Sequence, residues 1–244
     1  MTRNRDIPAL SPETAALARR LLIHEDAAIL AFNKPSGMAS QGGSSVGQSL
    51  DDLLWAFARS NGKRPRLVHR LDQGTSGVIL TARTQPAAAF LSAAFAGRDA
   101  KKTYLALVKG KIPPAEHGVI DASLVKVEEG GRPRMILARE GRKNAQPART
   151  GWQVLARNGD HALMQLTPET GRMHQIRVHL MSLGCPILGD GLYGEGQGTG
   201  ARVMLHAARL EVPHPDGSTL ALEAPVPEDF QAMAEKAGLQ AGLK

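Results

Sequence analysis

Asp72 lies in the segment HRLDQGTSG (residues 69–77), which surrounds a carboxylate with a histidine, an arginine, hydroxyl side chains and glycines. A carboxylate can act as a nucleophile toward an electron-poor carbon. Short apolar runs flank this segment, and loops held by rigid strands commonly carry catalytic side chains. The same residue types also build ordinary turns, in which an aspartate satisfies its own backbone. The donors around Asp72, which include His69 and Thr75, favour a catalytic carboxylate, with the turn as the alternative.

A second chemically rich segment is GRMHQIRVHLMSLG, residues 171–184. Its apolar residues recur at helical spacing and predict a core-facing stripe of Met173, Ile176, Leu180 and Leu183. Arg177 falls on the edge of that stripe. A guanidinium pressed against a core needs an anionic partner, unless its stem packs while its head stays in water. The spacing does not identify such a partner.

The elements that must position these residues are strands with a few helices that do not alternate regularly. This pattern predicts an α+β fold with a mostly antiparallel sheet. Helices are expected over residues 50–62, 85–96 and 171–184 and from residue 227 onward, and a turn followed by a strand is expected in 23–32. Further strands are expected near 67–68, 78–80, 103–108, 150–159 and 161–168, a hairpin in 203–212 and 218–225, and short strands and loops in 109–150.

The composition restricts the class of protein. The chain has 244 residues, and no apolar run approaches the roughly 20 residues of a membrane span. Cys185 is its only cysteine, which excludes an internal disulfide and a cysteine-built metal site. Residues 1–20 predict a polar lead-in with a short helix and no secretory signal. These features predict a cytoplasmic enzyme or binding protein. No low-complexity linker separates domains, so one domain over residues 21–244 is expected.

The charge favours a polyanionic partner. Lys and Arg number 30 against 23 Asp and Glu, which gives a net charge of +7. Contacts to phosphates release condensed counterions, so such an excess favours nucleic-acid binding, although a soluble basic protein without a special partner has the same composition.

The histidines suggest metal binding only weakly. His174 and His179 are five residues apart and lack the zinc-protease arrangement of two histidines four apart. Histidines that form hydrogen bonds or face solvent are the preferred interpretation. A metal-dependent hydrolase stays an alternative.

Taken in order, several motifs resemble the RluA-like family of pseudouridine synthases. They are NKPSG (33–37), HRLDQGTSG, KTYLALVKG, LTPETGRMHQIRVHL, GCPILGDGLYG and LHAARLEVPHP. The resemblance covers residues from about 24 to about 230 in the family's order and spacing. It implies the family's α+β catalytic fold, with a mixed, largely antiparallel central sheet flanked by helices and loops.

The resemblance also implies roles for individual residues. Asp72 matches the catalytic aspartate, and Arg177 matches the arginine that pairs with it. Tyr104 matches the tyrosine that stacks on the target base and is implicated in handling the proton at carbon 5. Arg70 matches the arginine that enters the RNA stack when the target uridine flips out. Further substrate-binding residues are expected at His69, Thr75, Ile176 and Leu205.

The chain departs from the family pattern in two places. Gln73 and Gly74 stand where relatives often carry a charged or bulkier pair, which affects loop flexibility or substrate choice. Many relatives carry a small N-terminal RNA-binding module, and about 20 residues before the catalytic domain are too few for one. Recognition of the RNA is therefore expected to rest on the catalytic domain.

The implied reaction is the isomerisation of uridine to pseudouridine in structured ribosomal or transfer RNA, by an aspartate nucleophile and base flipping. It needs no cofactor or metal, and the resemblance implies no membrane and no obligatory protein partner. The expected partner is an RNA stem-loop, whose unstacked bases can be reached by side chains. The main rival is an RNA-binding or ribosome-assembly factor on the same fold, in which catalysis has been lost.

Overall fold

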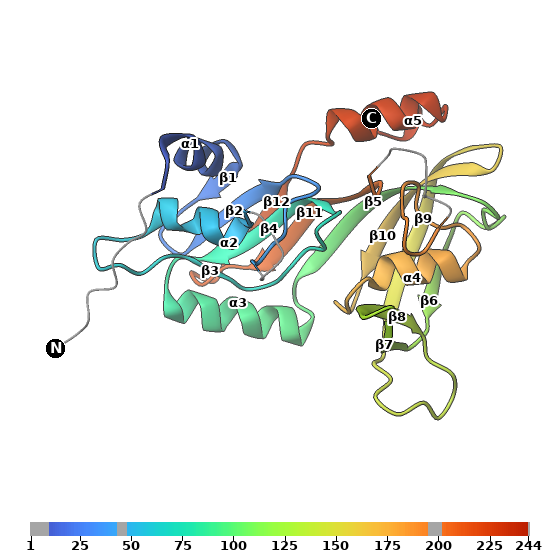
Figure 1. Cartoon of the computed structure of the whole chain (residues 1–244), viewed down its shortest axis with the longest axis horizontal. Helices are drawn as coiled ribbons and strands as arrows, with labels where there is room; N and C mark the ends of the chain where they lie inside the picture. Colours follow the sequence, from blue (N-terminus) through green and yellow to red (C-terminus); the bar gives the residue numbers. More distant parts are fainter. Residues whose placement is uncertain (1–9, 43–47, 195–201, 244) are drawn as a thin grey trace. The chain divides into compact units, whose positions relative to one another are not determined.

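The structure is a computed structural model that describes residues 10–42, 48–194 and 202–243, apart from the side chain of Arg132. The chain forms two compact units (Figure 1). Unit 1 comprises Met1–Ala100 and Arg209–Pro225, and unit 2 comprises Lys101–Ala208 and Val226–Lys244. Strand β11 (Leu205–Pro213) begins in unit 2 and ends in unit 1.

Unit 1 contains a sheet of antiparallel strand pairs. β2 pairs with β1 and with β4, β3 also pairs with β4, and β12 pairs with the end of β11. The elements are α1 Pro12–Arg20, β1 Leu22–Glu25, β2 Ile29–Lys34, α2 Leu50–Leu53, the 3-10 helix η1 Leu54–Phe57, β3 Arg66–Leu67, β4 Ser76–Ala82, α3 Gln85–Gly97 and β12 Thr219–Glu223.

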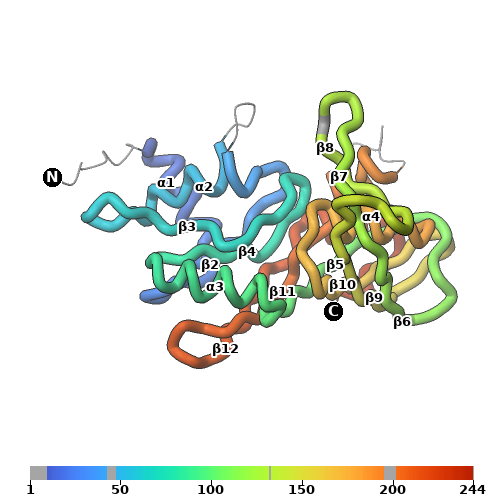
Figure 2. Tube along the Cα trace, turned by 90° about the horizontal axis from the view of Figure 1, so that it is seen from below, coloured from blue at the N-terminus to red at the C-terminus, as the bar shows by residue number. Residues whose placement is uncertain are grey.

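Helices cover both faces of the central strands β2 and β4. Alternate side chains of a strand point to opposite faces. Ile29 belongs to the same apolar cluster as Leu91 of α3. Phe32, three residues further along β2, lies edge-on to Phe57 of η1, with ring centroids 5.5 Å apart. Figure 2 shows α2 and α3 on opposite sides of these strands, which explains why every residue of β4 is buried.

Unit 2 is a second antiparallel arrangement, with strand order β5-β10-β9-β6 and a separate β7–β8 hairpin. Helices α4 and α5 contribute buried residues to the core that β5, β9 and β10 form. The elements are β5 Lys101–Lys109, β6 His117–Asp121, β7 Leu124–Glu129, β8 Arg132–Leu137, β9 Arg149–Asn158, β10 His161–Pro168, α4 Gln175–Ser182, α5 Glu228–Lys236 and the 3-10 helix η2 Gln240–Leu243.

The predicted α+β class with largely antiparallel pairing is confirmed, and most elements fall where the sequence places them. One exception is the helix expected over residues 50–62. Ser49 and Asp52 form a reciprocal capping box that starts it. The helical backbone ends at Phe57, because Ala58 is extended with ψ 139°. In addition, Leu22–Glu25 is a strand where the sequence predicts a turn.

The helix expected over residues 171–184 is also shorter, and this changes the position of Arg177. α4 begins only at Gln175, because His174 has left-handed backbone with φ 53°. Met173 therefore precedes the helix and cannot share its apolar stripe. All residues from Gln175 to Leu180 are buried, so Arg177 lies inside unit 2, not at the edge of a stripe as predicted. Within the described residues, no helix is long and apolar enough to cross a membrane.

Cys185 follows α4 and is fully buried. Burial raises the pKa of its thiol to about 11. Because the thiolate is the reactive form, only about one thiol in 10⁴ would be ionised at pH 7. We expect a thiol reagent to label the folded protein no faster than the protein unfolds, and to label it at once in denaturant. The sequence has no other cysteine, so fast labelling of the folded chain would contradict this burial directly.

Candidate active site

The segment that carries Asp72 connects β3 to β4 in unit 1. We call residues 68–75 the Asp72 loop. Both strands pair with each other, with Leu67 opposite Thr81, so the loop is anchored at both ends. Within it, the backbone N–H of Thr75 donates to the carbonyl of Asp72 at 3.0 Å. The expected role of Thr75 in substrate binding stays a prediction, and its side chain is buried with 2% exposure.

A buried serine fixes the residue immediately before Asp72. Ser40 Oγ donates to the carbonyl oxygen of Leu71 at 2.7 Å, and the N–H of Leu71 donates back to Ser40 Oγ at 3.0 Å. One side chain thus satisfies both backbone groups of Leu71. Buried polar groups must find partners in this way, because leaving them unpaired is costly. The pair restricts the position of the backbone next to Asp72.

The NKPSG segment holds the residues immediately after Asp72. Lys34 is fully buried, and its ammonium donates to the carbonyls of Pro35 at 2.9 Å and Met38 at 2.8 Å and, at 3.4 Å, to that of Gln73. Ser36 Oγ donates to the carbonyl of Gly74 at 2.7 Å.

Gly37 completes this attachment through its own backbone. Its N–H donates to the Gln73 carbonyl at 2.8 Å, and its carbonyl accepts from Gln73 Nε2 at 2.9 Å. Sequence reasoning treats the segment as a breaker and a family signature and does not foresee that it binds the Asp72 loop.

His69 attaches the beginning of the same loop to β4 and α3. The backbone N–H of Leu80 donates to His69 Nε2 at 2.9 Å. The ring stacks on Phe95, with centroids 4.4 Å apart and planes inclined by 24°. Since Nε2 accepts a hydrogen bond, the ring proton is assigned to Nδ1. These contacts give His69 a part in holding the loop, and its expected contact with substrate stays a prediction.

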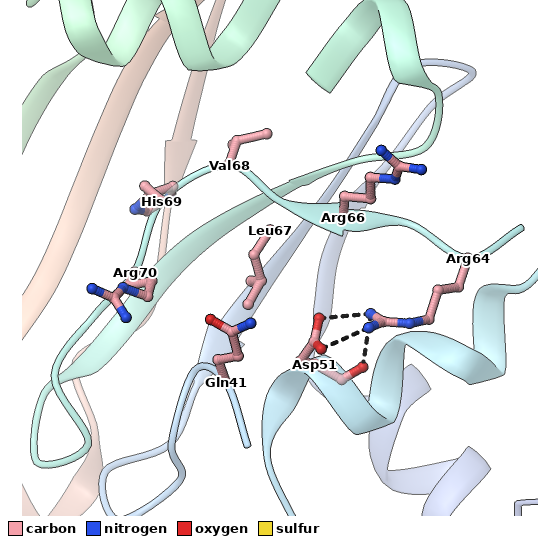
Figure 3. A pocket seen from close by; sticks show the side chains of 8 residues that line it. All are labelled: Gln41, Asp51, Arg64, Arg66, Leu67, Val68, His69 and Arg70. Atoms are coloured by element: carbon pink, nitrogen blue, oxygen red, sulfur yellow. Dashed lines mark hydrogen bonds and ion pairs between the residues drawn. The ribbon is translucent and has the colours of Figure 1, made fainter. Parts of the chain in front are cut away.

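Arg70 is exposed. It lines a pocket of about 390 Å³ in unit 1, together with His69 and residues of β3 (Figure 3). An exposed guanidinium on a fixed backbone can reach a large ligand such as RNA.

Three of the predicted residues lie together in unit 2. Ile176 of α4 and Leu205 of β11 are buried members of the same apolar cluster, and Tyr104 of β5 packs against it while partly exposed. Tyr104 lies opposite Leu166 of β10. The structure therefore places Ile176 and Leu205 in one apolar cluster and Tyr104 against it, and their expected roles stay predictions.

Arg177 forms a buried two-pronged ion pair with Asp190. Arg177 Nε lies 2.7 Å from Asp190 Oδ2, and Nη2 lies 2.8 Å from Oδ1. Arg177 is 9% exposed and Asp190 is fully buried. Burial alone would raise the pKa of Asp190. The bonds and charge of Arg177, with the N–H groups of Leu192 and Tyr193, outweigh burial and hold that pKa below its usual range.

Tyr193 extends this network beneath the guanidinium. The Arg177 guanidinium carbon lies 5.0 Å from the centre of the Tyr193 ring, a cation–π distance. The Tyr193 hydroxyl accepts from the N–H of Met135 at 2.9 Å and lies 2.9 Å from His174 Nδ1. His174 is the residue whose left-handed backbone starts α4. The network fixes both the helix start and the guanidinium orientation.

Sequence reasoning missed Asp190 and Tyr193, although the motif GDGLYG, which contains both, was a usable signal. The predicted pairing of Arg177 with Asp72 joins side chains of the two units and stays a prediction. The predicted site residues divide between the units: His69, Arg70, Asp72 and Thr75 in unit 1, and Tyr104, Ile176, Arg177 and Leu205 in unit 2.

His179 is a buried histidine within hydrogen-bond distance of two protein groups. Its Nδ1 lies 2.9 Å from Thr150 Oγ1, and its Nε2 lies 3.0 Å from the carbonyl of Ala122. Burial lowers the pKa of His179. Throughout the described ranges, no three His, Cys, Asp or Glu side chains are grouped as ligands for a metal ion.

Comparison with known proteins agrees with the motifs. Residues 28–182 match the RNA pseudouridylate synthase family. The dual-specificity RNA pseudouridine synthase RluA of Yersinia pestis is 38% identical, over 82% of this chain and 95% of that protein. The ribosomal large subunit pseudouridine synthase C of Escherichia coli is 36% identical, over 95% of this chain and 75% of that protein.

A solved structure extends the agreement to the fold. Human RNA pseudouridylate synthase domain containing 4 superposes with a TM-score of 0.78 at 28% identity, covering 93% of this chain and 97% of that one. The predicted fold is therefore confirmed as that of a pseudouridine synthase. The chain belongs to the RluA-like family of RNA pseudouridine synthases.

Proposed function

We propose that this RNA pseudouridine synthase modifies uridines in stem-loops of ribosomal or transfer RNA, with Asp72 as its catalytic carboxylate. The strongest support for Asp72 as the catalytic carboxylate is that its loop is attached to the rest of unit 1 on both sides of this residue. Leu71 is bound by Ser40, and Gln73 and Gly74 are bound by the NKPSG segment. A nucleophile needs a fixed position relative to the atom that it attacks.

The reaction breaks the bond between ribose carbon 1′ and base nitrogen 1 and forms a bond from carbon 1′ to carbon 5 of the same base. Carbon 5 loses a proton and nitrogen 1 gains one, so the product is an isomer of the substrate. A carboxylate at Asp72 is suited to covalent catalysis at the ribose or at the ring, or to promoting elimination to a glycal. Tyr104 would stack on the detached base and handle the proton at carbon 5.

Base flipping precedes this chemistry, because a stacked uridine is out of reach. Unstacking costs a few kcal/mol, and an arginine that fills the vacated space offsets part of that cost. Arg70 suits this role because it is exposed and lies two residues before Asp72. Arg177 would pair with Asp72, and its guanidinium is oriented by Asp190 through Nε and Nη2.

The relatives support this choice of RNA, since one is a ribosomal large subunit enzyme and one is a dual-specificity RNA enzyme. Unpaired loop bases are also the part of folded RNA that proteins read most readily. The cytoplasmic location predicted from the sequence fits such substrates and stays a prediction.

The test is a map of pseudouridine after incubation of the protein with unmodified ribosomal and transfer RNA transcripts, beside a sample without protein. We expect new sites in loops of one or both RNA classes. Sites confined to other RNA, found when total unmodified RNA is mapped, would overturn the substrate class alone. A folded, RNA-binding protein that creates no site in any RNA would favour the binding-factor alternative.

A further inference from the structure

The pocket beside Arg70 is lined by further positively charged side chains that have no role in the proposed reaction. Figure 3 shows Arg66 and Arg70 extending from the two ends of one chain segment, with Gln41 and Leu67 between them. The complete lining is Gln41, Asp51, Arg64, Arg66, Leu67, Val68, His69 and Arg70.

The single carboxylate among these lining residues is already neutralised. Arg64 Nη1 and Nη2 each lie 2.6 Å from one oxygen of Asp51. The Arg64 guanidinium carbon also lies 5.3 Å from the centre of the Trp55 ring. Arg64 and Asp51 therefore form a preorganised neutral pair on the pocket wall, and the pair leaves no acidic side chain to oppose an incoming anion.

Two arginines of the pocket have no partner among the residues that the structure describes. Across the residues that the structure describes, the side chains of Arg66 and Arg70 form neither a hydrogen bond nor an ion pair, and both are exposed. His69 adds no charge in the assigned state, because its Nε2 accepts from Leu80. The segment that lines the pocket therefore carries an excess of two positive charges on a fixed backbone, with the two guanidinium groups directed away from each other (Figure 3).

The position of Arg66 differs from that of an arginine on a flexible, solvated surface segment. Arg66 is held in β3 by pairing with Ala82 of β4. An extended chain between Arg66 and Asp72 is about 22 Å long at most. An RNA that places its target uridine at Asp72 therefore passes close to the pocket, and a guanidinium fork matches the two oxygens of a phosphate.

We propose that this pocket binds a backbone phosphate of the substrate RNA, with Arg66 as its main ligand and the Asp51–Arg64 pair as its neutral wall. The inference rests on the proposed function, since it takes the RNA strand next to the target uridine as the ligand. Phosphate contacts set the register of a protein on a nucleic acid without reading its sequence. The pocket would thus add affinity for the strand that carries the target uridine, whatever the sequence of that strand.

The test compares Arg66→Ala with the wild type in RNA affinity as a function of salt. The probe is a transcript of a mapped stem-loop, or an unmodified transfer RNA transcript if no site has been mapped. Each phosphate contact adds about 0.7 to 0.9 to the slope of log affinity against log salt. We expect Arg66→Ala to lower the slope by about that amount and to weaken binding roughly tenfold. Arg66→Lys should retain most of the slope.

Arg98→Gly is the matched control. Arg98 is exposed, does not line the pocket, and has φ 68°, a conformation that glycine adopts without strain. An equal fall in slope in this variant would mean that Arg66 contributes only to the general charge. An unchanged slope in Arg66→Ala would overturn the phosphate site.

Single-turnover pseudouridine formation at saturating enzyme separates this inference from the proposed function. We expect Arg66→Ala to match the wild-type rate there, because the phosphate contact acts on binding. A lost rate at saturation would overturn the assignment as a binding residue. Wild-type protein that makes no pseudouridine would refute the proposed function, whereas the salt slopes test the pocket independently of activity.

Discussion

Replacement of Asp72 by asparagine is expected to lower single-turnover pseudouridine formation by at least about 10³-fold, as loss of an essential nucleophile does. Asparagine keeps the shape of the side chain and removes the nucleophilic oxygen. The loop itself should stay in place, because Ser40 and the NKPSG segment bind the backbone on either side of Asp72. The measurement is pseudouridine yield with enzyme in excess, with RNA affinity determined in parallel.

Asp99→Asn provides the control for loss of one negative charge from unit 1, because Asp99 is exposed and outside the Asp72 loop. It should leave both rate and affinity unchanged. If Asp72→Asn retained a tenth of the wild-type rate, Asp72 would not be the nucleophile. If it lost RNA affinity as severely as rate, its role would be structural.

The second large effect is expected at Asp190. Asp190→Asn breaks the buried ion pair with Arg177 by removing one of its charges, and breaking a buried pair in this way typically costs about 3–5 kcal/mol. We expect the free energy of unfolding in urea to fall by about that amount. Activity should fall as well, because the guanidinium loses the carboxylate that aligns its Nε and Nη2.

The difference in the free energy of unfolding between the wild type and Asp190→Asn should depend on pH in a definite direction. The pKa of Asp190 lies below its usual range in the folded state. The ion pair therefore contributes fully above the unfolded value of about 4, and its contribution is lost as the pH falls through the lower folded value. The stability gap between wild type and Asp190→Asn should be constant above about pH 4 and narrow below it.

A double variant separates stability from function at this pair. Arg177→Met combined with Asp190→Leu removes both charges, and apolar replacements of a buried pair are commonly neutral or stabilising. We expect the double variant to regain most of the lost stability and to stay inactive. Recovered activity would show that Arg177 has no catalytic part, and an Asp190→Asn variant as stable as the wild type would show that the pair is not desolvated.

The sequence predicts local features well because periodicity and turn residues act over short distances. The strands around Asp72, the hairpins and α3 follow from such patterns. The length of α4 does not, because nothing in the apolar spacing reveals that His174 has φ 53°. The predicted length of the helix after Ser49 is too great for the same reason, since Phe57 fits the apolar spacing while the backbone of Ala58 is already extended.

Residues of the candidate site can be predicted where they belong to a recognisable motif. They cannot be predicted where they bind a group that lies far away in the sequence. Asp72 and Arg177 stand in motifs. Ser40 and Lys34 act through backbone carbonyls 31 and 39 residues away, and a backbone carbonyl has no sequence signature. Asp190 lies only 13 residues from Arg177, but a carboxylate in a glycine-rich loop reads equally well as a turn residue.

The ammonium group of Lys34 takes the place of a structural cation beside the Asp72 loop, and it is part of the polypeptide. It gathers carbonyl oxygens from its own segment and from Gln73 at one buried point. An ion tethered by a covalent stem cannot exchange with solvent or be removed by a chelator. The carbonyls accept donors spread around a compact point charge, whereas the planar fork of arginine would direct its donors elsewhere. The backbone beside Asp72 is thereby held by a cation that the chain itself supplies.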